Sequence, residues 1–189
     1  MPRLPQIIVA DDDKTVRTVI VHALTKQGYQ VGAATTAAGM WDIATSGRGT
    51  LLITDVGFPD GDALELLPRL QERRPDLSII VMSARANLLT AIKTQQSGVF
   101  DYLPKPFELK QLIAVVEQAL SEQPNMPSAD VTVNMPASIS SALMGKSPTM
   151  QNTFKLLARL SSQSVPVLIK AETGSGKPLI ARTLHEMGQ

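Results

Sequence analysis

The sequence predicts an α/β domain with a five-stranded parallel sheet that is doubly wound, meaning that helices cover both of its faces. Five segments of strand length alternate with five segments of helical periodicity, and this alternation is typical of parallel sheets with crossover helices. The third strand segment, residues 51–55, is apolar without alternation until it reaches Asp55, as expected of a strand buried on both faces. Sites in such sheets lie beyond the carboxyl ends of the strands, so Asp55 is the first candidate site residue.

The first two strand–helix units are short. Residues 6–10 form an apolar strand, and residues 14–27 carry an apolar stripe of helical spacing that Gly28 closes as a C-terminal cap. Residues 30–34 form a second, weaker strand. Residues 37–46 form the next helix, which ends at a pair of nearby glycines. Two such units in succession are what a parallel sheet requires.

The third helix has its own start signal. Asp62 with Glu65 three residues later resembles a capping box, followed by leucines at helical spacing. Pro68 lies inside that leucine stripe, and we expect it to bend or loosen the helix because proline removes one backbone donor.

Two further units complete the sheet. Residues 78–83 form the fourth strand, and residues 87–97 form a short helix of modest amphipathicity. Residues 99–103 form the fifth strand, which leads into Pro104-Lys105-Pro106. Residues 108–122 then carry the apolar stripe of the last helix.

Composition changes after this unit. Residues 123–142 hold several prolines, serines and asparagines with little periodicity, which predicts a linker. Ser147-Pro148 is typical of a helix start, residues 165–170 of a sixth strand, and a last helix follows a glycine-rich loop. We therefore divide the chain into residues 1–122, 123–142 and 143–189.

The charge and composition exclude several classes of function. The formal net charge of +1 gives no electrostatic reason to expect nucleic acid or a membrane as a partner of the whole chain. The absence of cysteine excludes disulfides, thiolate metal sites and cysteine nucleophiles. The start of the sequence lacks the apolar core of a signal peptide, and no run approaches membrane-spanning length. We expect a cytoplasmic protein.

Polar side chains follow four of the predicted strands. Asp11 and Asp12 follow the first, Asp55 ends the third, Ser83 ends the fourth, and the fifth leads to Lys105. Because parallel strands align their carboxyl ends, all of these side chains are expected at one rim. Grouped carboxylates repel one another unless a cation lies between them, and Mg²⁺ suits an all-oxygen, partly hydrated site. A lysine and a hydroxyl beside them would hold the oxygens of a phosphoryl group.

Each of these residues alone has an ordinary structural explanation. A single Asp at a strand end is usually a cap or a turn former, and a single Lys is usually a solvated charge. The joint pattern, with the right residue types at successive strand ends of one sheet, favours a functional site.

Residues 6–122 resemble the receiver domain of two-component response regulators. The resemblance implies a flavodoxin-like sheet of order 2-1-3-4-5. It implies that Asp55 is the phospho-acceptor and that Lys105 senses the phosphoryl group. Ser83, Tyr102 and Pro106 are the implied switch residues, with a cis peptide between Lys105 and Pro106. The implied Mg²⁺ ligands are the carboxylates of Asp11, Asp12 and Asp55 and the carbonyl of Gly57.

The same resemblance implies a partner and a response. Asp55 would attack the phosphohistidine of a sensor histidine kinase as a carboxylate nucleophile. Ser83 would then move inward and Tyr102 would follow, which would repack the face made by residues 87–97, 99–103 and 108–122. The resemblance also implies a homodimer through that face.

The glycine-rich loop near the end resembles a phosphate-binding loop. Gly-x-x-x-x-Gly-Lys-[Ser/Thr] holds phosphates with backbone amides and a lysine, and residues 171–178 read Ala-Glu-Thr-Gly-Ser-Gly-Lys-Pro. Gly174, Gly176 and Lys177 match the pattern, whereas Ala171 and Pro178 depart from it. With residues 143–150 and 179–185, this loop resembles the start of the AAA+ domain of enhancer-binding activators. The receiver and this segment together resemble the NtrC family of nitrogen regulation.

Two hypotheses follow, and they belong to different classes. The first is a phospho-accepting signalling module that is not itself an ATPase and binds ATP weakly if at all. The second is an ATP-dependent activator of sigma-54 RNA polymerase, of which this chain is a fragment or a degenerate copy. In the family, the Walker B acids, the arginine finger and the DNA-binding helices lie beyond the position of Gln189. Polymerase and DNA are thus expected as partners only of a full-length relative, and residues 143–189 are expected to be marginally folded.

Overall fold

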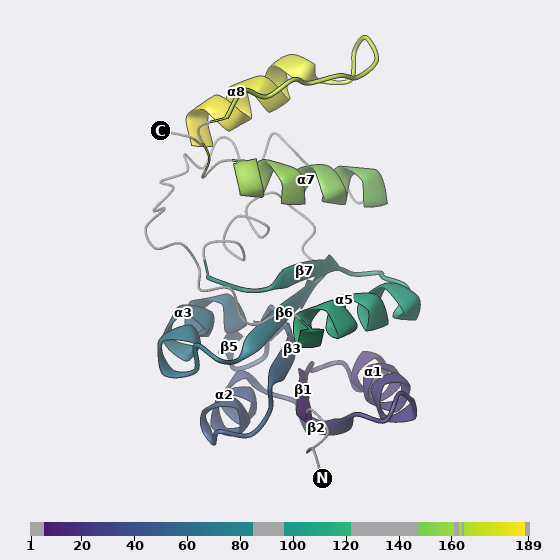
Figure 1. The fold of residues 1–189 in the computed structure, drawn as a ribbon, viewed down its shortest axis with the longest axis vertical. Helices are drawn as coiled ribbons and strands as arrows, with labels where there is room; N and C mark the ends of the chain where they lie inside the picture. The colour runs from purple at the N-terminus through teal and green to yellow at the C-terminus, as the bar shows by residue number, and fades with distance from the viewer. Residues whose placement is uncertain (1–5, 85–96, 122–146, 161–162, 164, 188–189) are drawn as a thin grey trace. The chain divides into compact units, whose positions relative to one another are not determined.

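The computed structural model describes residues 6–84, 97–121, 147–160, 163 and 165–187 (Figure 1). The chain divides into two compact units, and the first contains residues 6–84 and 97–121 of the described part. The second contains the described residues from 147 onwards. The predicted helix at 87–97, apart from Ser97, and the predicted linker at 123–142 lie outside the described residues.

The first unit is built on a five-stranded parallel sheet of order β2-β1-β3-β6-β7. This confirms the predicted fold class and the predicted strand order. The last strand begins later than expected and includes Pro104. The strands are β1 (Gln6–Ala10), β2 (Gln30–Ala34), β3 (Leu51–Asp55), β6 (Ser78–Ser83) and β7 (Asp101–Pro104).

Helices cover both faces of this sheet (Figure 1). The core on the side of α1 (Lys14–Lys26) and α5 (Leu109–Ser121) joins buried residues of both helices to apolar residues of β1, β3, β6 and β7. Helices α2 (Ala37–Thr45) and α3 (Ala63–Arg73) contact each other on the opposite side. Because β1, β3 and β6 are buried almost completely, they can consist of apolar residues without alternation.

Helix ends follow local sequence signals. Asp13 caps α1 by accepting hydrogen bonds from the amides of Thr15 and Val16. Asp62 caps α3 through the amide of Leu64 at 2.9 Å, so this start signal was correctly predicted. Helix α3 continues through Pro68 to Arg73, and the leucines on its inner face stay buried. The proline therefore does not end the helix, and it lies on the exposed side.

A short hairpin after β3 was not predicted. Strands β4 (Gly57–Phe58) and β5 (Gly61–Asp62) pair antiparallel, with Gly57 opposite Asp62 and Phe58 opposite Gly61. At its base, the amide of Ala63 donates to the carbonyl of Val56 at 2.8 Å. The segment between β3 and α3 is thus a closed, hydrogen-bonded loop.

In the second unit, helices α7 (Pro148–Leu160) and α8 (Lys177–Met187) confirm the two predicted helices. The amide of Met150 donates to the Ser147 hydroxyl at 3.3 Å, as an N-cap requires. The predicted strand at 165–170 is wrong, because these residues have no strand conformation. A strand needs a partner for its backbone groups, and no described strand pairs with this segment, in which Leu168 is 78% exposed.

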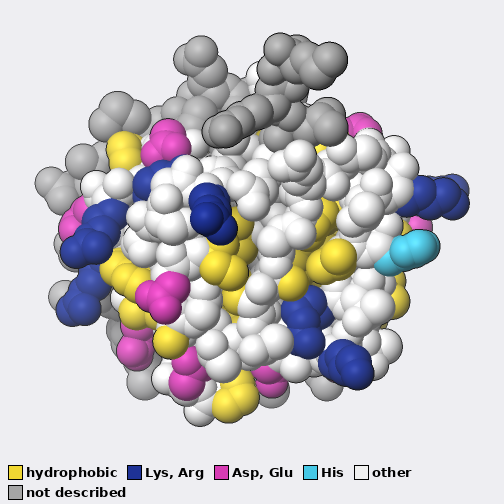
Figure 2. Space-filling view, turned by 90° about the horizontal axis from the view of Figure 1, so that it is seen from below, with side chains coloured by type: hydrophobic (Ala, Val, Ile, Leu, Met, Phe, Trp, Pro, Cys, Tyr) yellow, Lys and Arg dark blue, Asp and Glu magenta, His cyan; other side chains and the backbone are white. Residues whose placement is uncertain are grey.

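Among the described residues, no helix is long and apolar enough to cross a membrane. Basic and acidic side chains both occur on the face shown in Figure 2, and the apolar side chains form small areas between them. That face therefore offers no extended surface of a single charge.

Candidate functional site

Three carboxylates meet at the carboxyl ends of β1 and β3. Asp11 and Asp12 directly follow β1, and Asp55 ends β3. The two strands are parallel neighbours in which Ala10 lies opposite Thr54, so the residues that follow are brought together. One carboxylate oxygen from each acid lies within 4.8 Å of the others. The structure thus brings together the three acids that the sequence placed at one rim.

The three acids differ in their exposure to solvent. Asp11 is fully buried, Asp12 is exposed, and Asp55 is half-buried. Burial raises the pKa of Asp11 above its usual value, although hydrogen bonding to Lys105 opposes the shift. The nearby charge of Asp55 raises it further. The buried carboxylate therefore favours a nearby cation.

Lys105 places its ammonium group between two of these acids. Its Nζ lies 2.7 Å from Asp11 Oδ2 and 2.6 Å from Asp55 Oδ2. Burial lowers the pKa of Lys105, but the hydrogen bonds to the two carboxylates outweigh it, and the pKa is raised. The backbone amide of Lys105 donates to the carbonyl of Ser83 at 2.8 Å, and the peptide bond to Pro106 is cis, as expected.

Ser83 and Tyr102 lie together beside the acids. Ser83 is buried at the end of β6, and Tyr102 lies on β7 with 4% of its surface exposed. Burial raises the pKa of Tyr102 to about 12, partly offset by a hydrogen bond with Ser83, and the charge of Asp55 contributes in the same direction as burial. Tyr102 is therefore a neutral hydroxyl near neutral pH, in hydrogen-bond contact with the predicted switch serine.

The donor set fits Mg²⁺. The three acids offer oxygen ligands only, and the exposed position of Asp12 leaves one side open to water, as a partly hydrated ion requires. The Gly57 carbonyl belongs to β4, directly after Asp55 and Val56. One oxygen of Asp55 accepts from the amide of Val56 at 2.6 Å, which fixes the carboxylate at the strand end.

One residue that sequence reasoning missed is Arg17. Its guanidinium donates to the backbone carbonyl of Asp11 at 2.6 Å, so it holds the turn that carries the first acids. The detectable signal was its position on α1, about one turn after the acidic run, where a long cationic side chain reaches back towards the helix start.

The buried charge of Asp11 gives a prediction about stability. Because its pKa is raised in the folded state, protonation favours folding, and this stability is lost as pH rises through the folded pKa. In metal-free buffer at pH 7, Asp11→Asn is expected to increase the free energy of unfolding, because the neutral amide lacks the burial cost of the carboxylate and Lys105 keeps Asp55 as its partner. Urea unfolding measures it, and the gain should shrink as the pH approaches 4.

Asp76 supplies the control. Its pKa is lowered by hydrogen bonding to Arg74, so Asp76→Asn is expected to change stability in the opposite direction at pH 7. Added Mg²⁺ should raise the stability of the wild type and not that of Asp11→Asn, because only a folded state with an intact site binds the ion. A destabilised Asp11→Asn protein at pH 7 would contradict this account.

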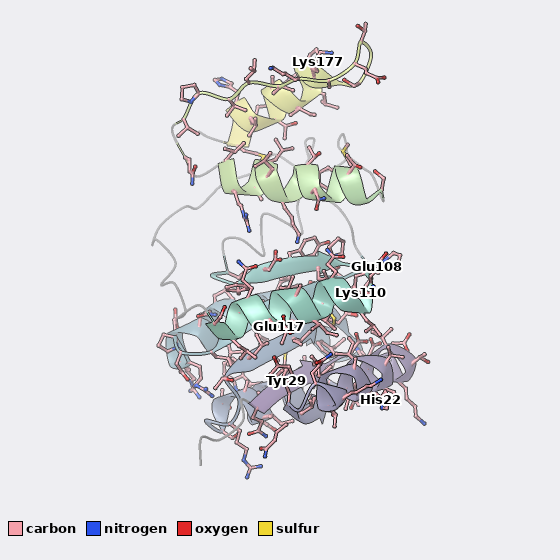
Figure 3. The ribbon with its side chains drawn as sticks, turned by 45° about the vertical axis from the view of Figure 1, so that its right-hand side comes forward. His22, Tyr29, Glu108, Lys110, Glu117 and Lys177 are labelled. Carbon is pink, nitrogen blue, oxygen red and sulfur yellow. The ribbon has the colours of Figure 1, made fainter. Side chains whose placement is uncertain are left out.

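The glycine-rich loop of the second unit leads directly into the amino terminus of α8. Gly174 and Gly176 have φ angles of 84° and 82°, a region that favours glycine. Lys177 begins the helix (Figure 3), and its Nζ donates to the carbonyls of Ala171 at 3.0 Å and Glu172 at 2.6 Å. The three matching residues are thus together, and the lysine is hydrogen-bonded to its own loop.

Two sequence families match this chain. The response regulator receiver domain matches residues 7–117, and the sigma-54 interaction domain matches residues 143–189. The DNA-binding transcriptional regulator NtrC of Azospirillum brasilense is 46% identical over 188 residues, which cover 97% of this chain. The protein of the same description from Escherichia coli K12 is 36% identical over 178 residues, 94% of this chain. The chain spans 38% and 37% of the length of these two relatives.

Solved receiver structures have the same fold. A response regulator receiver domain protein from Methanospirillum hungatei superposes with a TM-score of 0.61 at 27% identity, over 64% of this chain and 96% of that one. A receiver domain protein from Clostridium thermocellum gives a TM-score of 0.59 at 26% identity, over 62% of this chain and 95% of that one.

Proposed function

The chain belongs to the response-regulator receiver family, and on this premise we propose that Asp55 accepts a phosphoryl group from the phosphohistidine of a sensor kinase in the cytoplasm. The chain is an NtrC-like response regulator that joins a receiver domain to the beginning of a sigma-54 interaction domain. The observation that supports Asp55 is its position: it is half-buried at the end of β3, within reach of two further acids and of Lys105.

The chemistry follows from these neighbours. A carboxylate oxygen of Asp55 attacks phosphorus and forms a P–O bond, while the bond from phosphorus to the donor nitrogen breaks and the imidazole leaves and takes a proton. Bound Mg²⁺ would offset negative charge on the acids and on the phosphoryl oxygens. Asp11, Asp12, Asp55 and the Gly57 carbonyl would hold it. Lys105, already beside Asp55 Oδ2, would hold a phosphoryl oxygen through its ammonium group.

The response would begin at the hydroxyl of Ser83. A phosphoryl group on Asp55 offers new acceptors beside that hydroxyl, so Ser83 would turn towards it and change its hydrogen bond with Tyr102. Because Tyr102 lies on the edge strand β7, its movement would reach the surface formed with α5. We propose this surface as the output face and as the contact of a homodimer.

A direct experiment tests the function. The purified chain is incubated with acetyl phosphate with and without Mg²⁺, and its intact mass is measured. The expected result is a single phosphoryl addition that requires Mg²⁺ and maps to the peptide containing Asp55. No addition in Mg²⁺, or equal addition in its absence, would overturn the proposal.

The second unit supports a narrower proposal. A helix amino terminus attracts phosphate, and Lys177 lies at the amino terminus of α8. Its ammonium group, however, is bonded to two loop carbonyls. Pro178 offers no hydroxyl at the position where the phosphate-binding loop has Ser or Thr. We therefore propose that ATP binds this loop weakly at most. Contact with sigma-54 polymerase and DNA, and control of nitrogen genes, are proposed for the whole regulator to which such a chain corresponds.

A further inference from the structure

The loop that follows Asp55 is attached to a helix far away in the sequence. We propose that Asp60 is a positioning residue for phosphoryl transfer, because its carboxylate ties the hairpin that carries Gly57 to the first turn of α2. The inference rests on the function proposed above and extends it to a residue that does not touch the reacting atoms.

The bond between Asp60 and α2 is two-pronged. Asp60 Oδ1 accepts from the amide of Ala37 at 2.9 Å, and Oδ2 accepts from the amide of Ala38 at 3.0 Å. Amides in the first turn of a helix have no acceptor within the helix, and the helix dipole favours a negative charge there. These hydrogen bonds lower the pKa of Asp60, which therefore stays ionised and keeps both acceptors across the neutral range.

The rest of the loop is fixed to α3. The hairpin β4–β5 closes it, Ala63 bonds back to Val56, and Asp62 caps α3. The base of the loop is thus attached to the start of α3, and its tip is attached to α2 through Asp60. The two attachments together set the orientation of the peptide units between them, including the one at Gly57.

Gly57 depends on this support because it cannot anchor itself. It has no side chain, it is exposed, and the space next to its α-carbon is open. The position of its carbonyl, a ligand in the proposed Mg²⁺ site, is therefore determined by the hairpin. Loss of an outer partner that orients a metal ligand weakens metal binding, although that partner never contacts the ion.

A purely electrostatic role for Asp60 is the alternative, and the structure offers a matched control for it. Asp60 and Asp42 line the same pocket of about 540 Å³, together with Trp41 and residues of α3. Asp42 is also an exposed carboxylate, but it lies on α2 itself and does not belong to the hairpin. If Asp60 acts only through its charge, neutralising Asp42 should have a similar effect.

The experiment measures Mg²⁺ binding by calorimetry in the full chain without a phosphodonor. Asp60→Ala is expected to weaken binding about tenfold, the lower end of the effect of losing an outer partner of a metal ligand. Asp60→Asn, which keeps one oxygen acceptor, is expected to lie between Asp60→Ala and the wild type. Asp42→Asn is expected to bind as the wild type does. Equal affinity of all variants, or equal weakening in Asp42→Asn, overturns the inference.

A second measurement separates positioning from general loosening. Amide resonances of Ala37 and Ala38 are followed during Mg²⁺ titration, and they are expected to shift in the wild type and to stay still in Asp60→Ala. A wild type whose two amides do not respond overturns the inference. Acetyl phosphate labelling is run in parallel: an unlabelled wild type refutes the proposed function, whereas a labelled wild type with unchanged Asp60 variants refutes only the role of Asp60.

Discussion

Asp55→Asn is expected to abolish phosphorylation by acetyl phosphate. The amide has the shape of the carboxylate but cannot form the acyl phosphate, because its nitrogen is not a nucleophile and its oxygen carries no charge. Asp11 cannot take over, since it is fully buried and bonded to Lys105. Intact mass after incubation with Mg²⁺ measures the effect, and the variant should show no addition.

Asp42→Asn is the control for this loss, because it removes an exposed carboxylate outside the acid cluster. It is expected to take up one phosphoryl group at the wild-type rate. Equal labelling of Asp55→Asn and the wild type would show that Asp55 is not the phospho-acceptor, and Asp12 would be the next candidate.

Lys105→Ala is expected to separate metal binding from phosphoryl transfer. The ammonium group of Lys105 bonds to two of the carboxylates that would hold Mg²⁺, so the ion competes with it for the same oxygens. A hydrogen bond to a charged group contributes about 1.5–3 kcal/mol, and the lower end of this range corresponds to a rise in Mg²⁺ affinity of about tenfold when these oxygens are freed. The rate of phosphorylation should fall by about a hundredfold, as it does when one donor to developing negative charge is removed.

Calorimetry and the kinetics of mass gain measure the two effects separately. Lys110→Ala, which removes an exposed lysine of α5, should change neither. If Lys105→Ala weakened Mg²⁺ binding as much as Asp12→Ala does, the lysine would be supporting the metal site, and its assignment to the phosphoryl group would be wrong.

The sequence predicts the sheet and the rim of the site because both depend on local patterns. Runs of apolar residues that end in Asp11, Asp55 and Ser83 are visible without any long-range information, and parallel strands leave few ways to order them. The prediction of a sixth strand at 165–170 was wrong because strand formation depends on more than a local pattern. An apolar run shows only that a strand is possible, and its formation depends on a neighbouring strand that periodicity cannot supply.

Contacts between distant residues were the other limit. Asp60 lies 23 residues from Ala37, and Lys105 lies 94 residues from Asp11, so only the folded chain shows that they are bonded. The site was found because its residue types occur together at successive strand ends of one sheet, although each alone is ordinary there. An aspartate in a turn next to glycine, as Asp60 is, is ordinary there, and its role in holding α2 leaves no mark in the sequence.

The closed loop after β3 has a consequence for how such sequences can diverge. Surface loops usually tolerate insertions and deletions. The segment between Asp55 and Asp62 should not tolerate them, because the hairpin register and the caps on two helices depend on the number of residues in it. One added or removed residue would move Asp60 off α2, so this segment should keep its length among related chains, while only the positions without a bonding role vary in composition.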